Sequence, residues 1–70
     1  MFIVIAILNQ GLDMVKKFSD LGEAIQFANE ELDLFIEWSG CEDYGYATED
    51  EWFAYGNIDK YDYSVYITEL

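Results

Sequence analysis

The feature that most constrains this sequence is an uninterrupted apolar run near its start, Phe2–Leu8. The run is rich in β-branched residues, which favours a strand, and a strand without polar positions is typical of one buried on both faces. It is not expected to be a signal peptide, because no basic segment precedes it and no small-residue cleavage site follows it. Its seven residues are also too few to cross a bilayer. The fold must therefore cover both faces of this strand.

A second strand is expected directly after the first. Asn9-Gln10-Gly11 is a turn signal, in which Gly11 is free to adopt a positive φ angle. The next segment, Leu12–Phe18, is more polar, and its two lysines are typical of an edge strand. Three of its apolar side chains share one face: Leu12, Met14 and Phe18. The two segments together predict a hairpin.

A long helix is expected after the hairpin. Ser19 and Asp20 are good N-cap residues, and Asp20 with Glu23 has the spacing of a capping box. Ser39-Gly40 ends the helix, since glycine readily takes the left-handed conformation after a helix. Between these ends the apolar residues recur at helical spacing and form one stripe: Leu21, Ala24, Ile25, Ala28, Leu32, Phe35 and Ile36.

The segment that follows the helix allows two interpretations. Thr48 and Glu51 match a capping box and Gly56 can end a helix, which predicts about two helical turns after the loop Cys41–Ala47. The competing interpretation is a hairpin of Tyr44–Ala47 with Trp52–Tyr55, because aromatic residues also favour strands. The helix is preferred, since both of its end signals agree.

The closing element is predicted to be a strand, Tyr61–Leu70, after a turn at Asn57–Lys60. Its inward side chains are Tyr61, Tyr63, Val65 and Ile67. The elements predict a single α+β domain over residues 1–70, with a three-stranded sheet in the order 2-1-3 and the long helix on one face. No second long helix is left for the other face of the first strand. A homodimer that packs face to face, or edge to edge through the last strand, would supply that cover.

The charge of the chain excludes several classes of function. It has 15 acidic residues against three lysines, no arginine and no histidine, which gives a net charge of −12. Such a chain repels polyanions, so we expect no direct binding to nucleic acid or to an anionic membrane. The lack of histidine excludes Ser-His-Asp and Cys-His nucleophiles and histidine zinc sites. We therefore expect no enzyme, no cofactor and no metal site.

The single cysteine bears on the cellular compartment in which the protein is expected to act. Cys41 cannot form a disulfide within one chain, and a lone thiol fits the reducing cytoplasm better than a secretory route. No cation or histidine lies beside it in the sequence to activate it, so we expect an inert thiol.

The negative charge is concentrated in one segment. Eleven of the acidic residues lie within residues 20–52, which contain no lysine. On the predicted helix they form a ridge opposite the apolar stripe, about 21 Å long: Glu23, Glu30, Asp33 and Glu37. Like charges at this spacing repel one another, and the ridge can imitate part of a DNA phosphate strand. A solvated surface and a partner-binding face both stay open as interpretations.

The tyrosines are the second candidate feature, because all six fall between Tyr44 and Tyr66. They cannot all be buried in so small a domain, and tyrosine and tryptophan among acids and small residues are typical of binding surfaces. The candidate partner-binding residues are Glu23, Glu30, Asp33, Glu37, Glu42, Asp43, Tyr44, Tyr46, Glu49, Asp50, Glu51, Trp52 and Tyr55.

The layout of the chain resembles that of small phage proteins made early in infection, in which the pattern strand, F-x-S/D-L-x-E-A, helix, strand is common. The matching residues are Phe18-Ser19-Asp20-Leu21-Gly22-Glu23-Ala24, followed by Ile25-Gln26-Phe27-Ala28. The acidity and the aromatic content are also similar to those of phage anti-restriction, anti-BREX and anti-CRISPR inhibitors. The resemblance implies an inhibitor that binds a host enzyme, either as a DNA mimic or on another surface of its target, and it transfers no functional residue.

The leading hypothesis is a non-catalytic, dimeric inhibitor that binds a basic surface of a host defence or nucleic-acid enzyme in the cytoplasm. The acidic ridge would supply attraction and specificity, and the tyrosines and Trp52 the desolvated contact. The alternative hypothesis is a small structural or accessory subunit whose charge serves solubility only.

Overall fold

The apolar run forms the centre of the sheet. The computed structural model describes all 70 residues, and in it β1 (Phe2–Leu8) lies between β2 (Gly11–Phe18) and β5 (Tyr61–Glu69), antiparallel to both. On one face of β1, Val4 and Ala6 are completely buried. The isoleucines on its other face are only half-buried. The predicted central strand is therefore present, and one of its faces is covered much better than the other.

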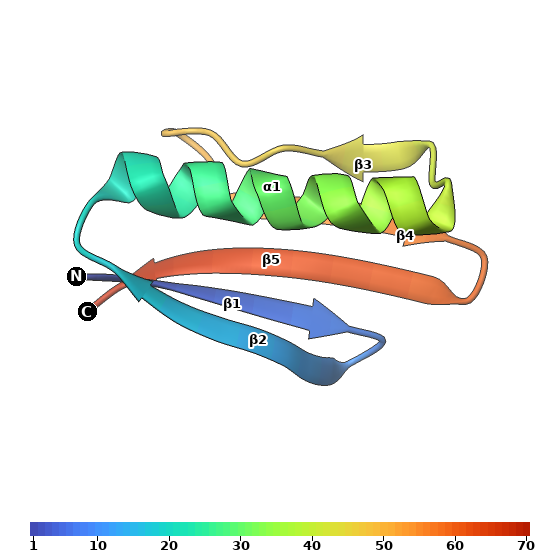
Figure 1. Cartoon of the computed structure of the whole chain (residues 1–70), viewed down its shortest axis with the longest axis horizontal. Coiled ribbons are helices and arrows are strands. Elements are labelled where there is room, and N and C mark those ends of the chain that lie inside the picture. The colour runs from blue at the N-terminus through green and yellow to red at the C-terminus, as the bar shows by residue number, and fades with distance from the viewer.

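The sheet has five antiparallel strands in the order β2-β1-β5-β4-β3. The two strands not yet described are β3 (Asp43–Gly45) and β4 (Phe53–Ile58). The single helix, α1 (Leu21–Ser39), packs across one face, and no helix lies on the other (Figure 1). The predicted α+β fold with one long helix on one face is confirmed. The predicted three strands in the order 2-1-3 are wrong, because β4 and β3 extend the sheet beyond β5.

The predicted short helix after Thr48 is also wrong. Thr48 does accept a hydrogen bond from the Glu51 amide through its side chain (3.1 Å), and the backbone groups of these two residues bond each other at 2.9 and 3.2 Å. These bonds close a tight turn and do not start a helix. The aromatic residues that follow pair with β5 as a strand. The competing hairpin interpretation is nearer to the structure, in which β3 pairs with β4 and Tyr44 lies opposite Gly56.

The long helix agrees with its prediction at both ends. The Asp20 side chain accepts a hydrogen bond from the Glu23 amide at 3.0 Å, and Gly40 takes the left-handed conformation (φ 73°) and donates to the Ile36 carbonyl at 2.8 Å. The buried residues of the helix belong to the predicted stripe: Ala24, Ala28, Leu32 and Phe35. Local caps and an apolar stripe are sufficient to define this element.

Strand β2 is an edge strand, as predicted, but it contains a bulge. Pairing passes from Ala6–Met14 to Ile7–Leu12, so Asp13 is an extra residue without a partner. A bulge reverses the alternation of side chains beyond it. Leu12 consequently lies opposite Ile7 on the helix-free face, whereas the sequence places it with Met14. In the preceding turn, the positive φ angles fall on Asn9 (50°) and Gln10 (69°) and not on Gly11.

The two ends of the chain lie side by side (Figure 1). The Leu70 amide donates to the Met1 carbonyl at 2.9 Å, which continues the ladder between β1 and β5. At the opposite end of this pair, Asn9 and Asp62 exchange two hydrogen bonds, each 2.8 Å long. The first and last strands of the chain are thus joined along their whole length.

Candidate protein-binding site

The acidic ridge predicted on the helix is present on α1. Glu23, Glu30, Asp33 and Glu37 are all exposed, on the side of the helix opposite its buried stripe. The only side-chain hydrogen bond among the ridge positions of the helix is a weak one, from the Gln26 amide to the Glu30 carboxylate at 3.3 Å. The ridge acids therefore face solvent without a cation from the helix itself.

Two tyrosines from β3 and the residues after it extend this surface. The Tyr46 hydroxyl donates a 2.5 Å hydrogen bond to Asp33, and this bond is the main reason that the pKa of Tyr46 rises to about 12. The Tyr44 ring packs edge-on against Tyr46, with the ring centres 5.6 Å apart. Both rings are exposed. The helix acids and the two tyrosines therefore form one joined surface, with the Tyr46 hydroxyl held at Asp33.

Asn29 fixes the loop that carries these tyrosines, and the sequence did not single it out. Its side-chain amide donates to the Ala47 carbonyl at 3.0 Å, and its side-chain oxygen accepts from the Ala47 amide at 2.8 Å. The loop between β3 and β4 consequently runs back alongside α1 (Figure 1). The signal for this contact is a polar residue, Asn29, at a helix position that is half-buried beside the apolar stripe.

The remaining predicted acids lie along the same flank. Glu42 precedes β3, and the turn that Thr48 closes contains the consecutive acids Glu49, Asp50 and Glu51, all of which are exposed. Asp43 is also exposed, but its pairing with Asn57 directs it toward the helix-free face of the sheet. We call the joined surface the acidic face. It consists of Glu23, Glu30, Asp33, Glu37, Glu42, Tyr44, Tyr46, Glu49, Asp50 and Glu51.

Besides Asp43, two predicted residues lie apart from the acidic face. Trp52 is half-buried, packs edge-on against Phe2 with ring centres 5.7 Å apart, and donates through its indole N–H to the Glu49 carbonyl at 2.9 Å. Tyr55 lies on the helix-free face, where its ring covers Gly45 and stacks with Phe53. Trp52 thus holds the acidic turn through its hydrogen bond to Glu49, and Tyr55 belongs to a different surface.

That second surface is the helix-free face of the sheet. Its large apolar side chains come from four strands: Ile3, Ile5, Ile7, Leu12, Val15, Phe53, Tyr55 and Tyr66. Leu12 is 70%, Val15 52% and Tyr66 44% exposed. Charges occur only at its ends, with Lys17 at one end and Asp43 and Asp62 at the other.

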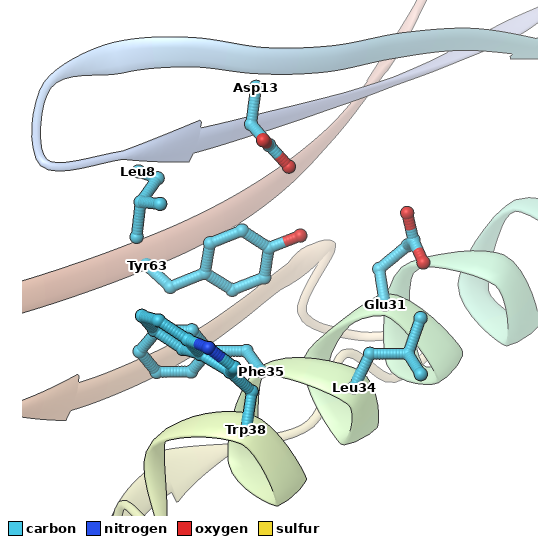
Figure 2. A pocket seen from close by; sticks show the side chains of 7 residues that line it. All are labelled: Leu8, Asp13, Glu31, Leu34, Phe35, Trp38 and Tyr63. Carbon is cyan, nitrogen blue, oxygen red and sulfur yellow. The ribbon is translucent and has the colours of Figure 1, made fainter.

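A groove between α1 and the β1–β2 hairpin is a third feature, and none of its residues was predicted to belong to a binding site. It has a volume of about 250 Å³ and is lined by Leu8, Asp13, Glu31, Leu34, Phe35, Trp38 and Tyr63 (Figure 2). The available signal is that Leu34 and Trp38, spaced four residues apart, are apolar but do not belong to the buried stripe of the helix. They are 61% and 63% exposed.

Comparison of the chain with protein-family models, with curated proteins and with solved structures finds no match. The surfaces of the molecule are therefore the guide to its function. The structure contains no group of three or more cysteine, aspartate and glutamate side chains that could hold a metal ion. None of its helices combines the length and the apolar character that crossing a membrane would require. The only thiol, Cys41, is buried.

Proposed function

We propose that this protein is a non-catalytic inhibitor, encoded by a phage, whose acidic face binds a basic surface of a host defence or nucleic-acid enzyme. The observation that carries the proposal is the acidic face itself: eight carboxylates and two exposed tyrosines share one flank, formed by a segment that contains no lysine. The lone thiol favours action in the cytoplasm.

The composition of the acidic face supports binding rather than solvation alone. Clustered like charges raise the free energy of the folded chain, and a partner of opposite charge relieves that repulsion. Charges of this kind steer association, while aromatic side chains supply the contact area that excludes water. The hydrogen bond between Tyr46 and Asp33 holds one of the aromatic side chains in place before binding, which lowers the entropic cost of association.

The experiment uses two variants that change the net charge equally. Glu30→Lys with Glu37→Lys reverses two acids on the ridge, and Asp59→Lys with Glu69→Lys reverses two exposed acids outside the acidic face. Circular dichroism first establishes that each variant is folded. Each protein then serves as bait in a bacterial lysate at low and at moderate salt. The retained proteins are identified, and their activity is assayed with and without the wild-type chain. We expect a partner that the control retains, that the ridge variant and added salt release, and whose activity falls on binding.

Each alternative has a distinct outcome, either in this experiment or when DNA is added to the purified complex. Equal retention by both variants contradicts binding through the acidic face. A stable complex with unchanged partner activity supports the accessory-subunit hypothesis instead. If partner and DNA bind at the same time, DNA mimicry is excluded and an inhibitor that docks elsewhere on its target is retained.

We further propose that the protein forms a homodimer through the helix-free face. This face is apolar at its centre, and it points away from most of the acidic face, so that two copies can approach with little repulsion. Lys17 at one end and Asp62 at the other suit a two-fold arrangement with the sheets antiparallel, which brings each lysine toward the acidic end of its partner. Two sheets packed in this way form a sandwich about 10 Å thick.

A further inference from the structure

The groove between α1 and the β1–β2 hairpin has an aromatic wall. The Phe35 and Tyr63 rings stack with their centres 4.9 Å apart, and the Trp38 ring leans against Phe35 at 6.1 Å. Leu8 and Leu34 complete the apolar lining (Figure 2). Phe35 and Tyr63 belong to the buried core and are held by it, so the wall exists before any ligand arrives.

Two carboxylates from different elements meet at this groove. Glu31 comes from α1 and Asp13 from β2, and both carboxylates lie toward the hydroxyl end of the Tyr63 ring (Figure 2). Burial, followed by the charges of Glu31 and Asp13, raises the pKa of Tyr63 to about 12. The Tyr63 hydroxyl therefore keeps its proton over the whole physiological pH range.

The bulge in β2 is what brings Asp13 to the groove. With regular alternation, Asp13 would share the helix-free face with Val15 and Lys17. As the extra residue of the bulge it turns toward α1 instead (Figure 2). Bulges commonly redirect a side chain in this way next to functional sites.

This combination of groups selects the charge of a ligand. An anion would be repelled by both carboxylates, and a neutral apolar ligand would bury them without a partner. A cation with an apolar stem satisfies every group: the charge lies between the carboxylates and over the aromatic wall, and the stem packs against the leucines. No lysine of the chain lines the groove.

The position of the groove relates it to the acidic face. Leu34 follows Glu30 by four residues and precedes Glu37 by three, so the groove opens directly beside the ridge on the same helix. A partner that covers the ridge therefore reaches the groove with a neighbouring side chain.

We propose that the groove binds the side chain of an arginine on the partner protein. The inference deepens the proposed function and rests on it. The planar guanidinium group can stack flat on an aromatic ring while its five N–H donors, held in a fixed fork, reach both carboxylates. The ammonium group of lysine has three donors but no planar surface to stack, so it fits this groove less well. In interfaces, such a buried arginine between aromatic residues carries a large share of the binding energy.

The test uses n-butylguanidinium, which reproduces the arginine side chain, and the neutral isostere n-butylurea. Each is titrated into the ¹⁵N-labelled protein at constant ionic strength, and the amide and tryptophan indole signals are followed by NMR. We expect saturable shifts centred on Trp38, Leu34 and Asp13, and n-butylurea weaker by about tenfold or more. n-Butylammonium should bind more weakly than n-butylguanidinium.

Variants of equal shape locate the site. Glu31→Gln and Asp13→Asn should each weaken n-butylguanidinium binding several-fold, whereas the control Glu37→Gln removes a ridge charge outside the groove and should leave it nearly unchanged. The inference is overturned if the shifts spread over the acidic face, if the three variants behave alike, or if n-butylurea or n-butylammonium binds as well. The titration needs no partner protein, so a negative result contradicts the guanidinium site and has no bearing on binding through the acidic face. A negative lysate experiment contradicts the proposed function and has no bearing on a guanidinium site measured by NMR.

Discussion

Gly56 is the residue at which the helix and the sheet come closest. A Cβ atom at this position would lie 3.0 Å from the Phe35 ring and 3.2 Å from the Leu32 side chain, both on the buried stripe of α1. The sequence suggests that Gly56 ends a short helix, but in the structure it lies inside β4 and leaves room for these two side chains. The glycine is therefore explained by close packing between helix and sheet, and not by the end of a helix.

We predict that Gly56→Ala lowers the free energy of unfolding by about 1–3 kcal/mol, because the added methyl group displaces the Phe35 ring from a packed core. Urea denaturation followed by circular dichroism measures the change. The matched control is Gly11→Ala, whose Cβ would lie at an ordinary 3.4 Å from the Leu8 carbonyl, and which should change stability by less than about 0.5 kcal/mol. Equal effects of the two substitutions would show that the contact with Phe35 is unimportant.

Asp13 illustrates what the sequence leaves open at the scale of single residues. The polar and apolar residues around it do not alternate strictly, since Met14 and Val15 are both apolar and Lys16 and Lys17 are both charged, and nothing in the pattern indicates a bulge. A regular strand therefore assigns Leu12 and Asp13 to the wrong faces. The acids of the ridge were easier, since helical spacing alone places Glu30, Asp33 and Glu37 together. The groove depends on Asp13 and was missed for this reason.

At the scale of elements, α1 and β4 show why some predictions succeed. The helix has both caps and its apolar stripe within its own sequence, and these local terms agree. For the segment after Thr48 the local signals also agreed with one another, but they have other causes in the structure. Thr48 and Glu51 close a turn, and the glycine leaves room for the helix. Pairing with β5 determines that the segment is a strand. Strand pairing is a long-range interaction that no local signal reports.

The loop between β3 and β4 depends on one side chain of α1, which leads to a prediction. Asn29→Ala removes both hydrogen bonds to Ala47, whose backbone groups are then left buried without partners. We expect a loss of about 1–3 kcal/mol in the free energy of unfolding and faster hydrogen exchange at the Ala47 amide. Asn29→Asp keeps an acceptor for that amide, so the Ala47 amide should stay better protected than in Asn29→Ala. It also sets a carboxylate oxygen against the Ala47 carbonyl oxygen, so the free energy of unfolding should still fall.

Hydrogen exchange also gives the outcome that would contradict this view. Protection at Ala47 that survives in Asn29→Ala would mean that the loop is held by other contacts, such as the bond between Tyr46 and Asp33. The control is Gln26→Ala, which removes only an exposed hydrogen bond to Glu30 on the same helix and should leave the loop unchanged.

At the scale of the whole molecule, the two faces of the sheet are unequal. One face is covered by α1, and the other exposes large apolar residues from four strands. This asymmetry was foreseeable from the sequence, because a strand that is apolar at every position needs two covers and the chain has one long helix. What could not be foreseen is that β4 and β3 widen this face and place Phe53 and Tyr55 on it.

The proposed dimer yields a prediction at this scale. Sedimentation across a dilution series from high to low micromolar concentration should show a dimer that dissociates. Tyr66→Lys places a charge at the centre of the face and should give a folded monomer, whereas Leu34→Lys changes an even more exposed apolar residue on the helix side and should leave the association unchanged. A wild-type chain that is monomeric at every concentration excludes the dimer.

The pairing of β1 with β5 determines how the fold responds to force. The two strands are antiparallel and the chain ends at the same place where it starts, so Phe2 lies opposite Glu69 at the end of the ladder (Figure 1). Tension applied between the ends of the chain is carried by one pair of hydrogen bonds at a time, beginning with the bond from Leu70 to Met1, and peels the two strands apart. Strands pulled along their length would share the load among all their bonds. The β1–β5 pair is therefore mechanically weak toward a pull applied between these two positions, whatever the thermodynamic stability of the fold.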